Sequence, residues 1–279
     1  MGEKQIYITQ SLIKSLLKYI EKEECGLIFE KKFLENRFDL FPPSDAMALG
    51  TWFEYCATKA LPKNGVIPQP ERTSKGELTA AYKKAEAQLD NFKKFMTFYG
   101  IKILEAGVDV VFDGLKGTYD IICLATRDII DEHGTVRVKA NQKFIIDTKF
   151  SGMLDDRWSE FGWNLETLNK KVNLIMQPIH YMYLSELAFG ERYPFVFLLF
   201  SSTNEKDFRA IFFDVSDEDI ERHKELIYKT GVKLKKIMEK GFKARPDVLR
   251  CAECPIKVGC KHFEAVPKLQ YFLLTNPNA

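Results

Sequence analysis

Two charged side chains in the segment KFIIDTKF have the types and the spacing for phosphodiester chemistry. Asp147 and Lys149 stand two residues apart in a stretch rich in isoleucine and phenylalanine, which predicts an extended strand. Residues i and i+2 of a strand point to the same face, so a carboxylate and an ammonium group would lie side by side. A carboxylate that binds Mg²⁺ beside a lysine provides both a metal ligand and positive charge for a phosphate under attack. The pair is therefore a candidate for metal-dependent hydrolysis of a phosphodiester.

Two further carboxylates are candidates to complete such a metal site. Asp120 lies in GTYDII on the preceding predicted strand, and Glu54 lies four residues after Gly50 on a predicted helix. Each motif alone is weak, because a surface ion pair, a strand-end aspartate and a solvated helix glutamate are plain alternatives. The order and spacing of all of them in one chain favour the metal site.

Four of the six cysteines are placed for a second kind of metal centre. Cys251, Cys254 and Cys260 form a C-x2-C-x5-C cluster, and Cys25 lies near the other end of the chain. Three clustered thiolates need a fourth ligand to complete a tetrahedral zinc site or an iron–sulfur cluster. The two remaining cysteines lie alone in apolar stretches and are predicted to be ordinary buried residues.

Composition restricts the class of protein. The chain has 279 residues, of which 46% are hydrophobic and 29% are charged, and this is typical of a soluble globular protein. The formal net charge of +2 does not by itself indicate a nucleic-acid-binding protein. The first ten residues lack the apolar run of a signal peptide, and the longest apolar stretch, 195–200, is too short to span a bilayer. We therefore expect a cytoplasmic protein with no membrane partner. We also expect it to be encoded by a bacterium or a phage, which is an expectation that does not come from composition.

The predicted elements form an α/β or α+β domain in which helices precede, interrupt and follow a sheet of about five strands. Strands are predicted near 104–113, 117–126, 142–150, 193–201 and 208–215. Helices are predicted near 10–23, 44–61, 77–99, 165–188 and 216–240, with a break or a new start at Pro178 in the fourth. We expect a single domain over 1–279, with a mainly helical part at 1–100, the sheet core at 101–215, and a last helix with the cysteine cluster at 216–279.

Taken together, the motifs resemble the PD-(D/E)XK nucleases, and specifically their RecB-type branch. That branch has a helical G-x3-E element, a strand aspartate, a strand D/E-x-K and a Q-x3-Y helix. The matching positions are Gly50–Glu54, Asp120, Asp147-Thr148-Lys149 and Gln177–Tyr181. An iron–sulfur subset, which includes AddB and the CRISPR-associated RecB-like exonucleases, has one cysteine before the nuclease core and three after it, as this chain has.

The resemblance implies a restriction-endonuclease-like core, with a mixed central sheet flanked by helices and with the two chain ends joined by a metal cluster. It also implies that Asp120, Asp147 and the backbone carbonyl of Thr148 bind Mg²⁺ or Mn²⁺. Glu54 would hold a second metal or a metal-bound water, and Lys149 would orient or help deprotonate the attacking water. The helix element lacks a histidine, and an aspartate stands where glutamate is commoner in D/E-x-K.

Further roles are implied for the two remaining motifs. Gln177 and Tyr181 would position the DNA strand near the scissile phosphate. The four cysteines Cys25, Cys251, Cys254 and Cys260 would ligate a [4Fe–4S] cluster, with Zn²⁺ as the competing occupant. His133 and His180 receive no role from the sequence.

The implied activity is a metal-dependent DNA exonuclease in recombination, repair, or phage or CRISPR DNA processing. Its expected partners are single-stranded DNA or DNA ends. The sequence has no G-x4-G-K-[ST] motif, so a helicase or recombinase partner would have to unwind the DNA. Two alternatives remain: a catalytically silent iron–sulfur scaffold that binds DNA or a helicase, and an endonuclease built on the same core.

Overall fold

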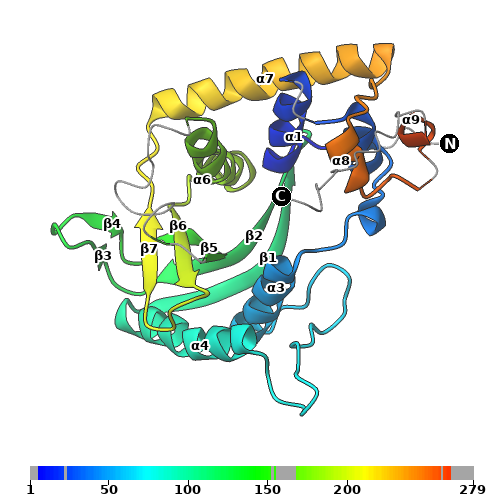
Figure 1. The fold of residues 1–279 in the computed structure, drawn as a ribbon. Helices are drawn as coiled ribbons and strands as arrows, with labels where there is room; N and C mark the ends of the chain where they lie inside the picture. The colour runs from blue at the N-terminus through cyan, green and yellow to red at the C-terminus, as the bar shows by residue number, and fades with distance from the viewer. Residues whose placement is uncertain (1–5, 22–23, 152–153, 155–167, 259, 265–279) are drawn as a thin grey trace, which may run out of the picture. The chain divides into compact units, whose positions relative to one another are not determined.

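The chain divides into two compact units, which we call the sheet unit and the cysteine unit. The computed structural model describes residues 6–21, 24–151, 154, 168–258 and 260–264 (Figure 1). The sheet unit comprises Met1–Ser11 and Pro43–Lys229, and the cysteine unit comprises Leu12–Pro42 and Thr230–Ala279. The cysteine unit is therefore built from two segments that flank most of the sheet unit in sequence. The single domain expected over 1–279 stays a prediction.

The sheet unit contains a five-stranded mixed sheet in the order β1-β2-β5-β6-β7. The strands are β1 (Ile101–Phe112), β2 (Leu115–Ala125), β5 (Lys143–Ser151), β6 (Phe195–Ser201) and β7 (Phe208–Phe212). Only β5 and β6 pair in parallel, and the other neighbours are antiparallel. A parallel pair needs a long crossover, and the connection between β5 and β6 contains helix α6 (Leu168–Phe189). The predicted α/β core with a mixed sheet of five strands is confirmed.

Helices cover both faces of this sheet (Figure 1). Helices α3 (Asp45–Thr58) and α4 (Ala80–Phe98) pack on one face, where they contact β5 and β1, and α6 contacts β1, β2 and β6 on the other. Every residue of β6 is buried, as its unbroken apolar sequence FVFLLFS predicts for a strand covered on both faces. The Ser44 hydroxyl accepts a hydrogen bond from the Met47 amide and so caps α3.

A two-stranded hairpin of β3 (Ile129–Ile130) and β4 (Val136–Val138) interrupts the chain between β2 and β5. The sequence does not predict these strands, which are two and three residues long. The Asp131 carboxylate accepts hydrogen bonds from the amides of His133 and Thr135, each at 2.9 Å, and so orders the turn.

Helix α6 runs through Pro178 without the break that the sequence predicts. Proline removes one helical N–H and usually ends or kinks a helix. Here Met176, His180 and Tyr181 are buried around it, so tertiary packing outweighs the local cost.

The cysteine unit is made of short helices and the second half of a long one. Its elements are α1 (Gln10–Ile20), which begins in the sheet unit, α2 (Gly26–Phe29), a π-helical turn at Glu30–Leu34, a 3-10 turn at Phe38–Leu40, the end of α7 (Asp217–Lys240), α8 (Val248–Ala252) and α9 (Lys261–Glu264). Its small core is aromatic, with the Phe242 ring stacked on Phe29 at 4.9 Å and near Tyr19 at 5.5 Å. None of the described helices is long and apolar enough to cross a membrane.

Candidate active site

The predicted metal site lies where β2 and β5 stop pairing. The two strands pair from Leu124–Lys143 to Ile121–Ile146, and the ladder ends there. The same register, continued by one residue, sets Asp120 opposite Asp147. Residues opposite each other on neighbouring strands have their side chains within contact distance. The fork between the strands therefore brings together two aspartates that are far apart in sequence.

The alternation of β5 distributes the D-x-K motif over both faces of the sheet. Asp147 and Lys149 share the face covered by α6, and the Lys149 ammonium forms an ion pair with Asp147 Oδ1. The same ammonium lies 5.5 Å from the ring centre of the buried Phe197, a cation–π contact that helps to hold it. The side-by-side carboxylate and ammonium that the spacing predicts are present.

Thr148, on the opposite face, links the motif to the two other carboxylates. Its backbone amide donates to Asp120 Oδ2 at 3.1 Å, and its hydroxyl lies 3.4 Å from Glu54 Oε1. Glu54 comes from α3, which covers this face of the sheet. One strand residue thus connects carboxylates from β2 and α3.

Helix α6 contributes the two residues of the Q-x3-Y motif. The Gln177 side-chain amide donates to Asp147 Oδ2. Tyr181 is buried, and its hydroxyl hydrogen bonds to the Gln177 side chain. Burial, followed by the charges of Asp147 and Asp120, raises the pKa of Tyr181, which keeps the phenol neutral. The structure therefore brings all seven predicted site residues of the sheet unit into one connected cluster.

The electrostatics of the cluster show too little positive charge. Burial raises the pKa of Glu54 to about 7, with Lys149 opposing the shift and Asp147 adding to it. Burial and then the charges of Asp147 and Glu54 raise the pKa of Asp120 well above its usual range. Burial would lower the pKa of Lys149, but the surrounding carboxylates more than offset this and raise it. One ammonium cannot balance three buried carboxylates, so a proton or a cation is needed.

A hard divalent metal would meet that need. Mg²⁺ and Mn²⁺ prefer oxygen donors, and the cluster offers carboxylates and the nearby Thr148 carbonyl. In the described part of the chain, no group of three or more histidine, cysteine or acidic side chains is already arranged to hold a metal ion. The donor chemistry fits, and binding would have to draw the carboxylates together and displace Lys149 or Gln177 from Asp147.

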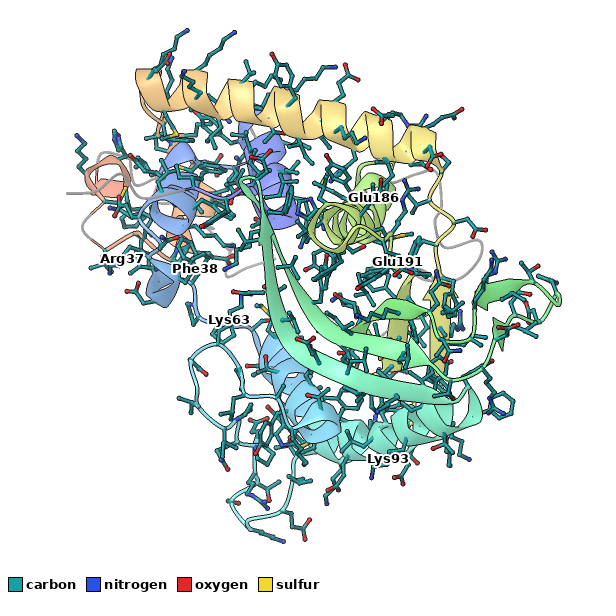
Figure 2. The ribbon with its side chains drawn as sticks, turned by 180° about the vertical axis from the view of Figure 1, so that it is seen from behind. Arg37, Phe38, Lys63, Lys93, Glu186 and Glu191 are labelled. Carbon is teal, nitrogen blue, oxygen red and sulfur yellow. The ribbon has the colours of Figure 1, made fainter. Side chains whose placement is uncertain are left out.

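A polar cluster beside the site has no signature in the sequence analysis. Asp109 on β1 forms ion pairs with Lys63 and Lys116, each at 2.7 Å, and accepts a hydrogen bond from Thr118 at 2.6 Å (Lys63 is labelled in Figure 2). Thr118 lies two residues before Asp120 on β2, about 7 Å along the strand. The only available signal is the alternation of polar residues along this part of β2.

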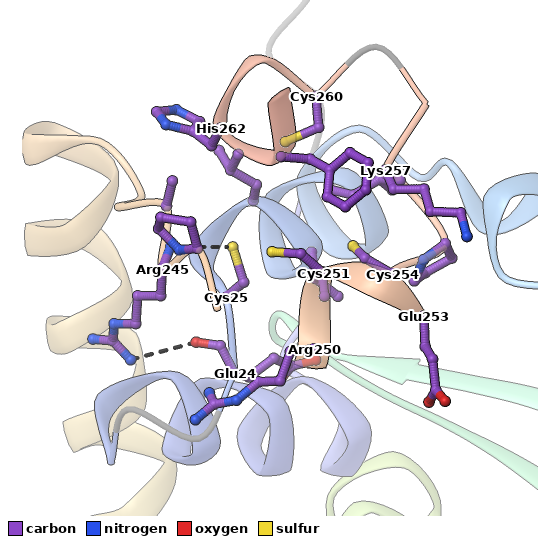
Figure 3. Close-up of a pocket in the computed structure, with 17 residues that line it drawn as sticks. Glu24, Cys25, Arg245, Arg250, Cys251, Glu253, Cys254, Lys257, Cys260 and His262 are labelled. Atoms are coloured by element: carbon purple, nitrogen blue, oxygen red, sulfur yellow. Dashed lines mark hydrogen bonds between the residues drawn. The ribbon is translucent and has the colours of Figure 1, made fainter. Parts of the chain in front are cut away.

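The four predicted metal-binding cysteines line one pocket of about 260 Å³ in the cysteine unit (Figure 3). All four are free thiols. Burial comes first among the causes that raise the pKa of Cys254, and the neighbouring thiols of Cys251, Cys25 and Cys260 add to it. Four thiols that line one pocket offer the soft donor set of an iron–sulfur cluster or Zn²⁺. They too are not yet arranged as a metal-holding group in the described residues.

Backbone amides already donate to two of these sulfurs. The amides of Arg245 and Asp247 lie 3.4 Å from the sulfurs of Cys25 and Cys251. The Arg245 guanidinium donates to the Tyr19 carbonyl and lies 4.5 Å from the Tyr19 ring centre. Arg245 thus fastens the segment before the three clustered cysteines to the segment around Cys25. Sequence analysis does not identify this residue, because nothing in its spacing marks it.

Comparisons with known proteins show a similarity of fold. No family model and no curated protein matches the chain. The fold is similar to that of a solved structure named "Putative exonuclease" from Eubacterium rectale, with a TM-score of 0.60 and 18% identity over 96% of this chain and 91% of that one. The similarity extends over nearly the whole of both chains and concerns the fold.

Proposed function

We propose that the protein is a metal-dependent deoxyribonuclease that hydrolyses phosphodiester bonds at DNA ends. The observation that carries the proposal is the convergence of Asp120, Asp147, Glu54 and Lys149 at the fork between β2 and β5. The fold similarity to a protein named as an exonuclease supports it. DNA processing in recombination, repair or CRISPR systems, and assistance from a helicase, are the wider expectations from the family resemblance.

Each residue of the cluster has a distinct task in this proposal. Asp120, Asp147 and the Thr148 carbonyl would hold Mg²⁺ or Mn²⁺, with Glu54 as an additional oxygen ligand. The metal would act as a Lewis acid that neutralises charge on the phosphate under attack. Lys149, held near Asp147 and over the Phe197 ring, keeps its proton and stabilises negative charge that develops on the phosphate.

Gln177 and Tyr181 of α6 would position Asp147 and the substrate. Gln177 donates to one oxygen of Asp147 and so orients the carboxylate. Tyr181 remains neutral and hydrogen bonds to Gln177, which positions that amide for Asp147 or for the DNA strand.

A silent DNA-binding scaffold is the second candidate, and one observation favours it. Both oxygens of Asp147 interact with protein groups, Lys149 at Oδ1 and Gln177 at Oδ2. In a scaffold these contacts would replace the metal permanently.

Cleavage assays separate the two candidates. End-labelled single-stranded and double-stranded linear DNA and matching circles would be incubated with Mg²⁺ or Mn²⁺. Lys149→Met is the test variant, and Lys93→Met, at an exposed position on α4, is the matched control (Figure 2). We expect metal-dependent loss of linear substrates that Lys149→Met abolishes and Lys93→Met preserves. Intact circles would identify an exonuclease. Wild-type protein that binds DNA and cuts none would favour the scaffold.

For the cysteine pocket we propose a [4Fe–4S] cluster, with Zn²⁺ as the alternative. Anaerobically purified protein would be analysed for iron, sulfide and zinc together with its visible absorption. A Cys254→Ser variant should lose the metal, whereas Cys123→Ser, at a buried cysteine of the sheet unit, should retain it. Retention of full metal content by Cys254→Ser would contradict the assignment.

A further inference from the structure

His180 is fully buried and forms two hydrogen bonds inside the sheet unit. Its Nε2 lies 3.1 Å from the Lys116 carbonyl oxygen on β2, and its Nδ1 lies 3.1 Å from Nε2 of His223 on α7. Both histidines are at most 4% exposed. One ring therefore connects α6 to a strand and to a second helix.

The acceptors decide where the ring protons lie. A carbonyl oxygen only accepts, so His180 Nε2 must carry a hydrogen. In the neutral ring His180 Nδ1 is then an acceptor, and His223 Nε2 must donate to it. Only one proton can lie between the two rings, and with both rings neutral it is the His223 proton that His180 Nδ1 accepts.

The Lys116 carbonyl on β2 and the metal site both lie where β2 has separated from β5. Because β2 and β5 stop pairing at Ile121–Ile146, the preceding part of β2 has no partner from β5. Ile8 covers one free group by accepting from the Lys116 amide at 3.0 Å, and His180 covers the Lys116 carbonyl. His180 thus satisfies a backbone group that the fork leaves open.

Two further contacts fit α6 closely against β2 at this point. Gly117 leaves so little space that a Cβ atom would lie 3.0 Å from the Tyr181 ring and 3.1 Å from Leu184. The buried Tyr119 hydroxyl donates to the Tyr181 carbonyl at 2.9 Å. The turn of α6 that carries His180 is therefore held by a ring, a close packing contact and a phenol.

This turn also carries Gln177, which lies one helical turn before His180 and donates to Asp147. Pro178 stands between them and removes one backbone hydrogen bond of the helix. Other contacts of this turn must compensate for the lost hydrogen bond if the Gln177 amide is to keep donating to Asp147.

We propose that His180 is a positioning residue of the active site, which, through the Lys116 carbonyl and His223, holds the turn of α6 that places Gln177 against Asp147. The proposal rests on the proposed nuclease function and adds a residue to it that contacts neither metal nor substrate.

Few charged groups face this pair. The Tyr183 ring contacts His223 edge-on at 6.2 Å, and Tyr181 lies 6.2 Å from His180. The neighbouring charges on α7 pair with one another, Arg222 with Asp219 and Lys224 with Glu221. Burial lowers the pKa of His180 to about 4, and burial with the charge of His180 lowers the pKa of His223 to about 3. Both rings are therefore neutral at neutral pH, which is the state in which His223 donates to His180.

Three variants test the proposal by kinetics. His180→Phe fills the site but removes both hydrogen bonds. His223→Gln is conservative, because its amide can still donate to His180. His133→Gln, at an exposed turn position, is the control. Single-turnover cleavage of labelled single-stranded DNA would be measured with saturating Mn²⁺ at pH 8, well below each melting temperature. We expect His180→Phe to be about 10- to 100-fold slower, as is typical when an outer-shell partner is lost. The two other variants should match the wild type.

A second readout does not depend on activity. In metal-free protein labelled with ¹⁵N-glutamine, His180→Phe should shift and broaden the Gln177 side-chain amide resonance, and His223→Gln should leave it in place. An unchanged amide resonance overturns the proposal, whether the rate falls or not, because the effect would not pass through Gln177. If the wild type cleaves no DNA but the amide responds as expected, the nuclease function fails and the positioning role is supported.

The pH dependence of unfolding gives a third readout. Both rings have folded pKa values below the ordinary 6.5, so the unfolded chain binds more protons between about pH 3 and pH 6.5, and stability falls as the pH drops through this range. His223→Gln should take up about one proton fewer on unfolding than the wild type. An unchanged proton uptake would show that His223 is not held neutral and would overturn the paired-ring geometry.

Discussion

The two candidate metal sites of this molecule are built in different ways. The carboxylate–lysine site stands on two strands and two helices, and its side chains are fixed by protein partners such as Thr148 and Gln177. The cysteine pocket stands on turns and very short helices, and its thiols are half-buried and free. The core fixes the backbone of a site on regular elements, although the side chains of this one must still move to bind metal. A site on turns depends on local contacts such as those of Arg245 and on the metal itself. Substitutions in the carboxylate–lysine site should therefore abolish activity while the sheet unit stays folded. Removal of metal from the cysteine pocket should unfold the cysteine unit.

The largest expected effect is on the chemistry of the sheet unit. Asp120→Asn keeps an oxygen that can accept from the Thr148 amide and removes a negative charge. We expect at least about a 100-fold loss of cleavage rate, the scale seen when one group that stabilises transition-state charge is removed. The melting temperature of the metal-free variant at pH 8 should equal or exceed that of the wild type. A large fall in melting temperature would contradict a preorganised site.

Removal of metal should act on the cysteine unit through its fold. After anaerobic treatment with a chelator, trypsin should cut at Lys243, Arg250 and Lys257 at least about tenfold faster, because each 1.4 kcal/mol of lost binding free energy changes the open population tenfold. Mass spectrometry of the fragments should find the sheet unit intact over the same time. If trypsin cut the cysteine unit equally fast with and without chelator, the fold of this unit would not depend on its metal.

A smaller effect concerns pH and Glu54. Its folded pKa of about 7 lies above the ordinary 4.5, so the folded protein binds the extra proton, and stability is lost as the pH rises from 4.5 through 7. Glu54→Gln should therefore stabilise the metal-free protein at pH 8 by up to about 3 kcal/mol and have little effect at pH 4.5. Melting temperatures at both pH values provide the measurement. Added Mg²⁺ should raise the melting temperature of the wild type more than that of the variant. If Glu54→Gln stabilised the protein equally at both pH values, Glu54 would not be protonated in the folded protein.

The smallest effects separate two glycines of the sheet unit. Gly117→Ala would press a methyl group against Tyr181 and Leu184, and we expect a loss of about 1–3 kcal/mol in the free energy of unfolding. Gly50→Ala meets no atom within 4 Å inside α3, so it should stabilise by about 0.5–1 kcal/mol and leave cleavage unchanged. Chemical denaturation of both variants tests this pair. Loss of cleavage in Gly50→Ala would assign the glycine of the G-x3-E motif a role beyond helix geometry.

Sequence patterns anticipate much of the sheet unit, because its strands and helices have strong periods. Alternation in KFIIDTKF predicts Asp147 and Lys149 on one face, and the structure has them there. The i, i+4 spacing predicts only that Gln177 and Tyr181 share one face of a helix, and their place at the site was implied by the family resemblance. Local signals failed at Pro178, where packing of α6 overrides the helix-breaking tendency, and at the short β3–β4 hairpin.

Local sequence patterns do not predict contacts between residues that are far apart in sequence. The hydrogen bond of His180 to the Lys116 carbonyl depends on where β2 and β5 separate. The hydrogen bond of Arg245 to the Tyr19 carbonyl depends on two segments that are far apart in sequence. Neither residue has a neighbour in sequence that signals its role. The metals and the roles of the site residues remain predictions.

The discontinuous make-up of the cysteine unit has a consequence for synthesis on the ribosome. Its fastenings join residues 220 to 226 positions apart, as in the Lys243 amide bonded to the Tyr19 hydroxyl and the Arg245 amide bonded to Cys25. These contacts cannot form until residue 245 has emerged, by which time the sheet unit, which ends at Lys229, is already complete in sequence. The sheet unit can therefore fold during translation, while the first segment of the cysteine unit must wait with an exposed thiol and an unpaired aromatic face. A nascent chain that stalls before Lys243 would thus be a natural target for chaperones and proteases.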